Sequence, residues 1–432
     1  MNSQTSRGEI ENQVHSALNR QPVVDMHTHL YPPAFGTPVA GRSGRADPSG
    51  LLLWGVDELL TYHYLVAEVF RVVPANRLPY EKFWKMSKRQ QADHIWKNLF
   101  VERAPIGEAC RGVLTTIQKL DLDPNESPEK WRKWFDQQDP SDYIDRVMRI
   151  ANVSSITMTN PVFDDNERER WLANPAVGSD PRFKAVLRID PMIRDWPGAA
   201  AKLSQWGYTC ESEVTPATIE SARKFLRDWL DRMKAIYIAV SLPPEWRYPS
   251  SNPGSQILEK VILPVCEERG LPFAMMIGSR LRVNPELRDG GDMVGQADIA
   301  SVANLCCAFP NNRFFVTMLP RENQHELAVA ARKFGNLMVF GCWWFLNNPS
   351  IIEEITRFRV ELLGTSFIPQ HSDARILDQL IYKWDHSRRI IGKVLTDKFV
   401  DMAATGRSVT AEQIDQTVRL MLQDNFRAFL AG

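Results

Sequence analysis

Short apolar runs and longer amphipathic stretches alternate along most of this chain. The amphipathic stretches repeat apolar residues at spacings of three and four, as Phe225, Trp229 and Met233 do, and this is the helical period. Two of them stop at Gly270 and Gly364, and glycine commonly follows the end of a helix. The apolar runs have the length of strands, and they lie at residues 22–30, 153–159, 183–189, 235–242, 272–279, 313–319, 337–344 and 367–373.

Strands that alternate with helices in this way predict parallel pairing through right-handed crossovers. We therefore expect an α/β protein with the (β/α)8 TIM barrel fold, formed as a single domain by residues 1–432. Residues 51–150 have helical spacing and no strand pattern, so we expect a long helical insertion after the first strand. An open, doubly wound sheet is the alternative. The barrel is favoured because polar residues end most strands on the carboxyl side, and a barrel gathers these ends at one mouth.

Charge and composition narrow the partners that the chain can have. Lys and Arg together number 52, as do Asp and Glu, so no overall charge favours a nucleic acid or an anionic membrane. No apolar run approaches the roughly 20 residues that span a bilayer, and the polar amino terminus lacks the apolar core of a secretory signal. Six cysteines without a C-x-x-C pair suit reduced thiols. We expect a cytoplasmic protein that acts on a small molecule, and the sequence leaves open whether it is a homo-oligomer.

The first strand ends in a pair of histidines, His27 and His29. Side chains alternate across a strand, so both imidazoles should point to the same face. Asp373 ends the last strand, which lies beside the first strand in a closed barrel. Two imidazoles and a carboxylate form a ligand set for a catalytic zinc ion with one open position. The alternatives are a histidine pair in a surface loop and an aspartate that caps the following helix.

Five segments carry a resemblance to a known family. Residues 25–30 (DMHTHL) resemble its D-x-H-C-H-L motif, and His63-Tyr64 resembles a helical D-H-Y-K-W segment. Residues 186–190 (VLRID) resemble W-R-P-D in the third strand, residues 341–345 (GCWWF) resemble G-x-W-W-F, and residues 372–375 (SDAR) resemble T-D-S-R. In a barrel, these motifs resemble the amidohydrolase superfamily, and within it a divergent member of the uronate isomerase (glucuronate/galacturonate isomerase) family.

The resemblance implies an aldose–ketose isomerase of hexuronates with one divalent metal, usually zinc. It implies that His27, His29 and Asp373 hold the metal, and that Tyr64 and Asp373 move a proton between C2 and C1 through an enediol. Arginine forks suit a carboxylate, and aromatic rings suit the face of a sugar. The substrate-binding residues expected on these grounds, with an arginine that follows the fifth strand, are His63, Arg188, Arg280, Trp343, Trp344 and Arg375.

Two positions depart from the family's pattern. The family has a histidine on the fifth strand where this chain has Met276, and an aspartate on the fourth strand where residues 240–243 read VSLP. His371 precedes Asp373 by two residues, so we expect both side chains on one face of the last strand. We hypothesise that His371 supplies an imidazole near the metal as the general base. A His371 that bonds a neighbouring backbone group is the alternative.

Three functions are compatible with these residues. The first is a metal-dependent aldose–ketose isomerase that acts on a hexuronate or a related acidic sugar. The second is a mononuclear, metal-dependent hydrolase of a lactone, ester or amide, and the third is a barrel that binds a sugar acid without turnover. One metal is expected, because residues 235–242 contain no lysine that could bridge two ions after carbamylation. The arginines and the paired tryptophans favour an acidic polyol as the ligand.

Overall fold

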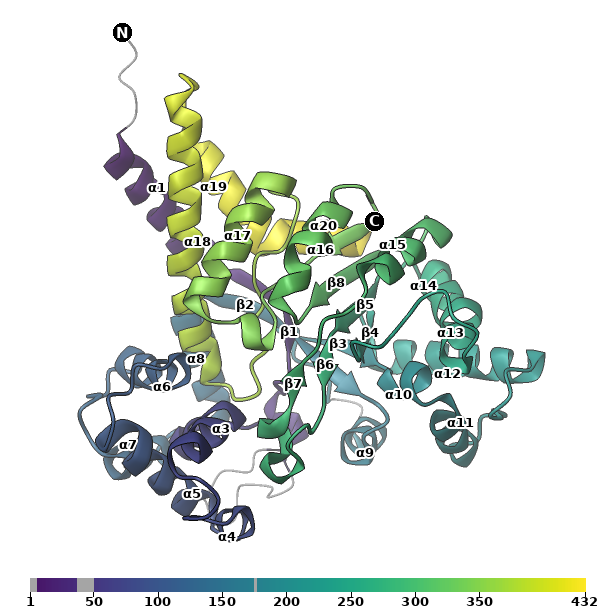
Figure 1. Ribbon diagram of the computed structural model, residues 1–432, viewed down its shortest axis with the longest axis horizontal. Coiled ribbons are helices and arrows are strands. Elements are labelled where there is room, and N and C mark those ends of the chain that lie inside the picture. Colours follow the sequence, from purple (N-terminus) through teal and green to yellow (C-terminus); the bar gives the residue numbers. More distant parts are fainter. Residues whose placement is uncertain (1–5, 37–49, 175–176) are drawn as a thin grey trace.

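The computed structural model describes residues 6–36, 50–174 and 177–432. Within these residues, seven parallel strands form one sheet in the order β1-β2-β3-β4-β5-β8-β9 (Figure 1). The strands are β1 (Val23–Thr28), β2 (Val153–Pro161), β3 (Phe183–Arg188), β4 (Ile238–Leu242), β5 (Phe273–Ile277), β8 (Phe314–Met318) and β9 (Leu337–Val339).

Residues 367–374, here called the closing segment, join the two edges of this sheet. On one side, the N–H of Gly341 donates to the carbonyl oxygen of Ile368 at 2.8 Å. On the other side, the N–H of Asp373 donates to His27 at 3.1 Å, and the N–H of His29 donates to Ala374 at 2.7 Å. The sheet therefore closes, and the α/β class and the (β/α)8 barrel are confirmed.

The closing segment differs from the regular strand expected over residues 367–373. One bridge, from Phe340 to Ile368, links it to the sheet in a strand-like way. Beyond that bridge, the side chain of Gln370 accepts hydrogen bonds from the backbone of Cys342 and His371, and Asp373 turns the chain with a φ of 50°. Hydrogen bonds to a side chain and a residue with a left-handed backbone conformation thus replace the backbone hydrogen-bond ladder of a strand.

Helices cover the outside of the sheet. Those between consecutive strands are α9 (Asp165–Ala173), α10 (Asp190–Arg194), α11 (Trp196–Gln205), α12 (Pro216–Met233), α13 (Pro253–Ile257), α14 (Leu263–Arg269), α15 (Ile299–Ala308), α16 (Gln324–Ala331) and α17 (Pro349–Leu363). The amino-terminal helix α1 (Arg7–Arg20) packs against α18 (Gln379–Ala404) and α19 (Ala411–Arg419), and the chain ends in α20 (Asn425–Ala431). Within the described residues, every helix is too short or too polar to cross a membrane.

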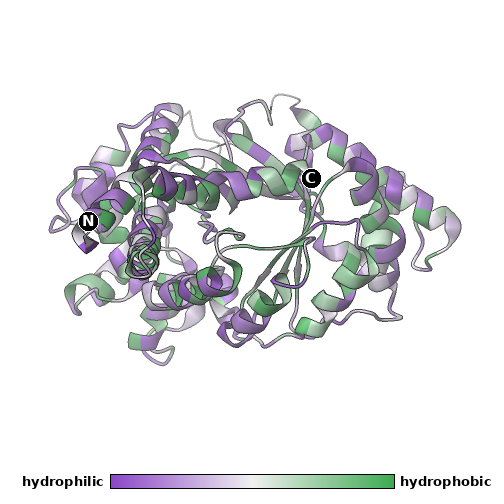
Figure 2. Cartoon of the chain, turned by 90° about the horizontal axis from the view of Figure 1, so that it is seen from above, coloured by the Kyte–Doolittle hydropathy of each residue, from purple (hydrophilic) through white to green (hydrophobic). Residues whose placement is uncertain are grey.

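The residues of a strand divide between an inner and an outer apolar cluster with a period of two. In β5, Ala274 and Met276 belong to the inner cluster, whereas Met275 and Ile277 pack in the outer cluster beneath the helices. Phe426 of α20 also belongs to the inner cluster. The helices carry both hydrophilic and hydrophobic residues (Figure 2), as expected of helices that pack one face on the core.

Seven α-helices of the described chain lie between β1 and β2, where the sequence predicts the helical insertion. They are α2 (Val56–Leu60), α3 (His63–Val72), α4 (Tyr80–Trp84), α5 (Lys88–Trp96), α6 (Glu108–Lys119), α7 (Pro128–Phe135) and α8 (Pro140–Ala151). Local signals fix several of their ends. Ser87 forms a capping box at the start of α5, and the Asp139 side chain caps α8. Most of these helices gather at the lower left of Figure 1.

A hairpin after β5, not anticipated from the sequence, reaches from the barrel to this insertion. Its strands are β6 (Ser279–Arg280) and β7 (Met293–Val294), and a short helical turn, η4 (Pro285–Gly291), lies between them. We call residues 279–294 the β6–β7 arm. The arm packs on α3 (Figure 1), and a Cβ atom at Gly290 would lie 3.0 Å from the carbonyl oxygen of His63. The arm therefore ties the barrel mouth to the insertion.

Candidate metal centre

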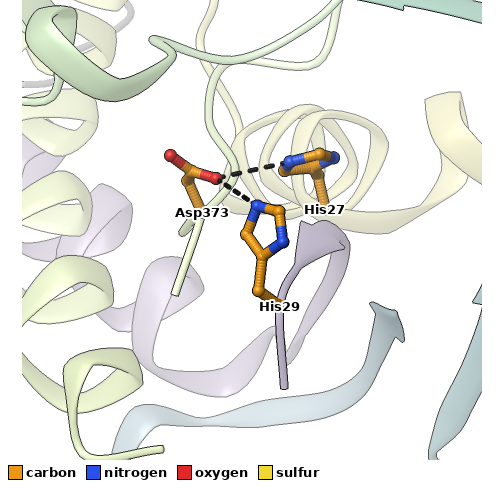
Figure 3. A group of neighbouring side chains, drawn as sticks. All are labelled: His27, His29 and Asp373. Atoms are coloured by element: carbon orange, nitrogen blue, oxygen red, sulfur yellow. Dashed lines mark ion pairs between the residues drawn. The ribbon is translucent and has the colours of Figure 1, made fainter. Parts of the chain in front are cut away.

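The side chains of His27, His29 and Asp373 meet at the carboxyl ends of the strands (Figure 3). Oδ1 of Asp373 lies 3.3 Å from Nε2 of His27 and 3.3 Å from Nε2 of His29. His27 and Asp373 are buried, and His29 is partly buried. The two imidazoles thus converge as the spacing of two predicts, although His29 lies one residue beyond β1.

Four contacts hold the turn that carries Asp373, whose φ of 50° is unfavourable for a residue with a side chain. The N–H of Asp373 donates to the carbonyl oxygen of His27 at 3.1 Å. Nζ of Lys383 donates to the carbonyl oxygens of Ser372 at 2.6 Å and Asp373 at 3.3 Å. The carboxylate of Asp25 accepts a hydrogen bond of 3.1 Å from the N–H of Ser372. The surroundings therefore fix the position of this carboxylate.

The electrostatics give these groups the protonation states of metal ligands. Burial alone would raise the pKa of the Asp373 carboxyl, but the imidazoles of His27 and His29 outweigh burial and hold that pKa well below its usual range. Burial lowers the pKa of His29 to about 3, against the attraction of Asp373. An ionised carboxylate beside a neutral imidazole is the state that binds a metal ion.

The atoms of this group fit a divalent metal ion. Oδ1 of Asp373 is buried and receives no hydrogen bond from the described residues, and such an atom is costly unless another group satisfies it. A tetrahedral ion with bonds of about 2.0–2.1 Å keeps neighbouring ligand atoms about 3.3–3.4 Å apart. Both separations from Asp373 to the imidazoles have this value.

A pocket that we call the metal pocket opens onto these three residues. Arg188 is fixed at its wall, because Nε donates to Asp190 at 2.5 Å and Nη2 donates to Ser241 at 2.9 Å. Arg375 lies on another wall, where Nη1 donates to Asp289 at 3.0 Å. Basic, aromatic, polar and apolar residues line the metal pocket: His27, His29, Arg188, Arg194, Ser241, Met276, Ser279, Leu281, Asp292, Trp343, Trp344, Asp373 and Arg375.

A second cavity of about 270 Å³, the side cavity, adjoins the metal pocket, since Asp292 and Trp344 line both. His63 and Tyr64 line the side cavity. Burial raises the pKa of Tyr64 well above its ordinary value, so its hydroxyl stays protonated. Four buried polar atoms around this cavity have no hydrogen-bond partner among the described residues: His63 Nε2, Tyr64 Oη, Trp344 Nε1 and Asn347 Nδ2. A ligand rich in hydroxyl groups can satisfy them.

Trp343 and Trp344 reach the metal pocket from a turn instead of a strand. The seventh strand, expected over residues 337–344, ends at Val339. Gly341 follows with a φ of 66°, and Trp344 has a φ of 49° at the start of a short helical turn. The left-handed residues end the strand early, and Trp343 and Trp344 are both buried against the pocket.

The structure does not bring Arg280 into the metal pocket. Arg280 is half-exposed at the base of the β6–β7 arm, and its guanidinium pairs with Glu245 at 3.0 Å. It does not line the pocket, although its neighbours Ser279 and Leu281 do. The expected substrate-binding role of Arg280 therefore has no support in this arrangement, because the hairpin turns its side chain away.

His371 lies beside the metal centre but not in the metal pocket. Its ring centroid is 5.2 Å from that of His27, yet the residue is fully buried and does not line the pocket. A general base must reach the substrate, so the structure does not support that role for His371. Neither ring nitrogen has a hydrogen-bond partner among the described residues, so the backbone-bonded alternative is not observed either. Its ring also contacts Phe340 of the inner apolar cluster, so His371 and Asp373 both approach His27 from inside the barrel.

Sequence reasoning assigned no role to several residues that shape this site. Asp25 precedes His27 by two residues, but the register of β1 shifts between Asp25 and Thr28, and the Asp25 carboxylate bonds Trp384 of α18, so the period of two gives no signal for its place. Lys383 lies within α18, and no sequence pattern relates the register of that helix to the barrel mouth. Asp289 and Asp292 belong to the β6–β7 arm, which has neither helical nor strand spacing.

The closed barrel and the converging His-His-Asp group define a (β/α)8 barrel protein with a candidate metal centre. No protein-family model and no curated protein matches the chain. Among solved structures, a uronate isomerase from Bacillus halodurans is 49% identical, and the match covers 99% of this chain and 97% of that chain with a TM-score of 0.93. The chain belongs to the uronate isomerase family, which confirms the resemblance.

Two more distant structures share the fold. A uronate isomerase from Thermotoga maritima is 15% identical, with 98% of this chain and 97% of that chain covered and a TM-score of 0.77. A glucuronate isomerase from Caulobacter crescentus is 14% identical, with 99% and 95% covered and a TM-score of 0.76. At this level of identity, the two structures support the architecture alone.

Proposed function

We propose that the protein is a metal-dependent isomerase that interconverts a hexuronate aldose and the corresponding ketose. The observation that carries the proposal is the convergence of His27, His29 and Asp373 in a pocket that Arg188 and Arg375 also line. Membership of the uronate isomerase family supports the same reaction. Zinc is the ion we propose, because two imidazoles and a carboxylate at these separations suit its coordination.

The arginines select an acidic substrate. Arg188 is oriented by Asp190 and Ser241, and Arg375 follows Asp373 by two residues. Guanidinium groups bind carboxylates through paired hydrogen bonds, so we assign the carboxylate of the hexuronate to Arg375 and neighbouring hydroxyl groups to Arg188. Trp343 lines the metal pocket and gives it an aromatic wall.

The proton transfer needs a base that stays ionised at neutral pH. The pKa of Asp373 is held well below its usual range by the two imidazoles, so we propose that its carboxylate takes the proton from C2 and returns it to C1. Bound zinc would polarise the sugar oxygens and stabilise the negative charge that develops on them. An enediol forms between these two steps. In the enediol, the oxygen on C1 has gained a proton, and the hydroxyl group on C2 loses its proton when the ketose forms.

Tyr64 is suited to the exchange of protons between the two oxygens. Its hydroxyl is buried, has no described hydrogen-bond partner and remains protonated because burial raises its pKa. It lines the side cavity, which shares Trp344 with the metal pocket. An open-chain sugar that extends from the metal pocket into the side cavity would bring its carbonyl end to Tyr64, which can donate to O1 and accept from O2.

Proton NMR in D2O tests this function. We expect zinc-loaded protein to convert D-glucuronate or D-galacturonate to the ketose and to exchange the proton at C2 for deuterium. Hydrolysis of a lactone or ester without ketose formation would instead support the hydrolase, and stoichiometric zinc with no turnover of either substrate class would support the binding barrel. Tyr64→Phe should retain zinc and lose most of the activity, whereas Tyr208→Phe, whose hydroxyl bonds Asp228, should match the wild type.

The cysteines bear on where the protein acts. All six cysteines are free in the structure, and five of them are buried. Free thiols in this number are typical of a reducing compartment, so we also propose a cytoplasmic location.

A further inference from the structure

The guanidinium that the proposed function assigns to the substrate is already paired with an acid. Nη1 of Arg375 donates to Oδ2 of Asp289 at 3.0 Å, and the two residues are 86 positions apart in the chain. Arg375 follows Asp373 by two residues, and Asp289 belongs to the β6–β7 arm. Asp289 thus already binds the guanidinium group of Arg375, to which the proposed function assigns the substrate carboxylate.

Asp289 lies at the boundary between cavities. It lines the side cavity and a further cavity of about 270 Å³, the outer cavity, which Arg375 also lines. It does not line the metal pocket itself. Arg375 therefore lines both the metal pocket and the outer cavity, and Asp289 is bound to it on the side of the outer cavity. A carboxylate that enters through the outer cavity meets Arg375 and Asp289 together.

The β6–β7 arm does not depend on Asp289 for its position. Nε1 of Trp84 donates to the carbonyl oxygen of Glu286 at 2.8 Å. The guanidinium of Arg288 stacks over the Trp84 ring, 4.2 Å from its centroid, and Gly290 packs closely on the backbone of α3. The ion pair can therefore open while the arm remains docked on the insertion.

We propose that Asp289 is an internal counter-anion of Arg375, and that the carboxylate of the substrate takes its place when the sugar binds. Two negative groups compete for one guanidinium, so the charge of Asp289 opposes carboxylate binding. A neutral sugar cannot displace it. Asp289 is thus a specificity-determining residue that limits how tightly sugar acids bind, and the assignment rests on the proposed function because that function places the carboxylate on Arg375.

The test compares a sugar acid with the matching neutral polyol. L-Gulonate is D-glucuronate with its aldehyde reduced, so it cannot isomerise, and D-sorbitol has the same carbon chain without the carboxylate. Calorimetric titration of zinc-loaded protein should show that Asp289→Asn lowers the Kd for L-gulonate by about two- to fivefold, the range expected when an exposed ion pair is lost. The affinity for D-sorbitol should stay unchanged. Asparagine keeps an oxygen that can accept the hydrogen bond from Arg375, so the arm should not shift.

Asp231→Asn is the matched control. Asp231 pairs with Arg269 at 2.9 Å, and the exposed fractions of this pair, 65% and 33%, resemble the 60% and 35% of Asp289 and Arg375. The control removes the same charge and a similar ion pair on α12, so it should leave the Kd for L-gulonate at the wild-type value.

A Kd for L-gulonate that is unchanged or raised in Asp289→Asn would overturn the inference. So would an equal shift for L-gulonate and D-sorbitol, or no binding of L-gulonate to either protein. These results are separable from a failure of the proposed function, which the NMR assay decides on the wild type alone. Ketose formation by the wild type together with an unchanged Kd would retain the isomerase and discard the role of Asp289.

Discussion

The carboxylate of Asp25 lies 3.1 Å from the main-chain nitrogen of Ser372, which donates a hydrogen bond to it across the seam where the barrel closes. The same carboxylate accepts a hydrogen bond of 2.8 Å from Nε1 of Trp384. Asp25 stands two residues before one metal-ligand candidate, and Ser372 stands one residue before another. One buried side chain therefore sets the distance between the halves of the metal centre.

We expect Asp25→Asn to weaken zinc binding by about 10- to 100-fold, which is typical when a residue that orients a metal ligand is changed. The amide retains one oxygen but loses the charge that two donors share. A competition titration with a chromogenic chelator measures the change. Asp378→Asn is the matched control, since Asp378 is a buried carboxylate that accepts from the N–H of Gly55. If both variants bind zinc like the wild type, Asp25 does not position the site.

Lys383→Met should separate metal affinity from stability. Lys383 is buried, and burial lowers its pKa to about 8, so removing the ammonium relieves a desolvation cost that offsets the two lost hydrogen bonds. We expect the free energy of unfolding in urea to change by less than about 1 kcal/mol. Zinc affinity should fall about tenfold, because the turn at Asp373 loses its donor.

Lys393→Met is the control for Lys383→Met, since Lys393 lies on the same helix, is half-exposed and pairs with Glu353. Lys393→Met should change neither the free energy of unfolding nor the zinc affinity. A Lys383→Met protein with wild-type zinc affinity would show that the left-handed turn holds its geometry without this lysine.

The sequence predicted those parts of the site whose positions follow from the periodicity of strands and helices. The spacing of His27 and His29 predicts a shared face, and the alternation of strands and helices places Asp373 beside them in a closed barrel. Both expectations depend only on backbone geometry that every strand has in common. The three residues do meet in the structure.

The parts that could not be foretold depend on local conformations without a period. Trp344 lies in a turn because its own backbone and that of Gly341 are left-handed. Asp289 reaches Arg375 through a hairpin whose path is set by its docking on α3. These positions depend on backbone turns or tertiary contacts that alternation does not encode.

The contribution of Glu167 to stability should fall as the pH rises through the range in which Glu167 ionises. Burial raises the pKa of Glu167 to about 7 from 4.5, although Asn160 and Tyr31 donate hydrogen bonds to it. Between these values the folded protein keeps a proton that the unfolded chain has released, so the free energy of unfolding decreases with pH. The decrease is on the order of 3 kcal/mol and levels off above pH 7.

Urea unfolding at pH 5 and pH 8 in the presence of a chelator measures this effect without the linkage to metal binding. Glu167→Gln should remove this contribution, so the stability of the wild type relative to this variant should decrease from pH 5 to pH 8. Buried His29, whose lowered pKa acts in the opposite direction, contributes equally to both proteins. Glu169→Gln, an exposed position on the same helix, should follow the pH dependence of the wild type. Equal pH dependence in the two variants would contradict the assignment to Glu167.

Gly341→Ala should disrupt the metal centre through His371. A Cβ atom at Gly341 would lie 1.8 Å from Nδ1 of His371. That ring is fully buried and packs against His27 and Phe340 with centroids 5.2 Å away in each case, so the added methyl group would press it toward these two side chains. Overpacking and a positive φ together should cost about 2–4 kcal/mol in the free energy of unfolding, and zinc affinity should fall as His27 is displaced.

Two comparisons isolate the steric cause. Gly270→Ala has a similar φ of 61° but no atom within 4 Å of the added Cβ, so it should cost only about 1 kcal/mol. His371→Ala opens the space that the new methyl group needs. The double variant Gly341→Ala/His371→Ala should therefore be more stable than the sum of the single effects predicts, by about 1–3 kcal/mol in a double-mutant cycle. If Gly341→Ala and Gly270→Ala cost the same, the contact with His371 carries no energy, and the backbone angle alone explains why glycine stands at position 341.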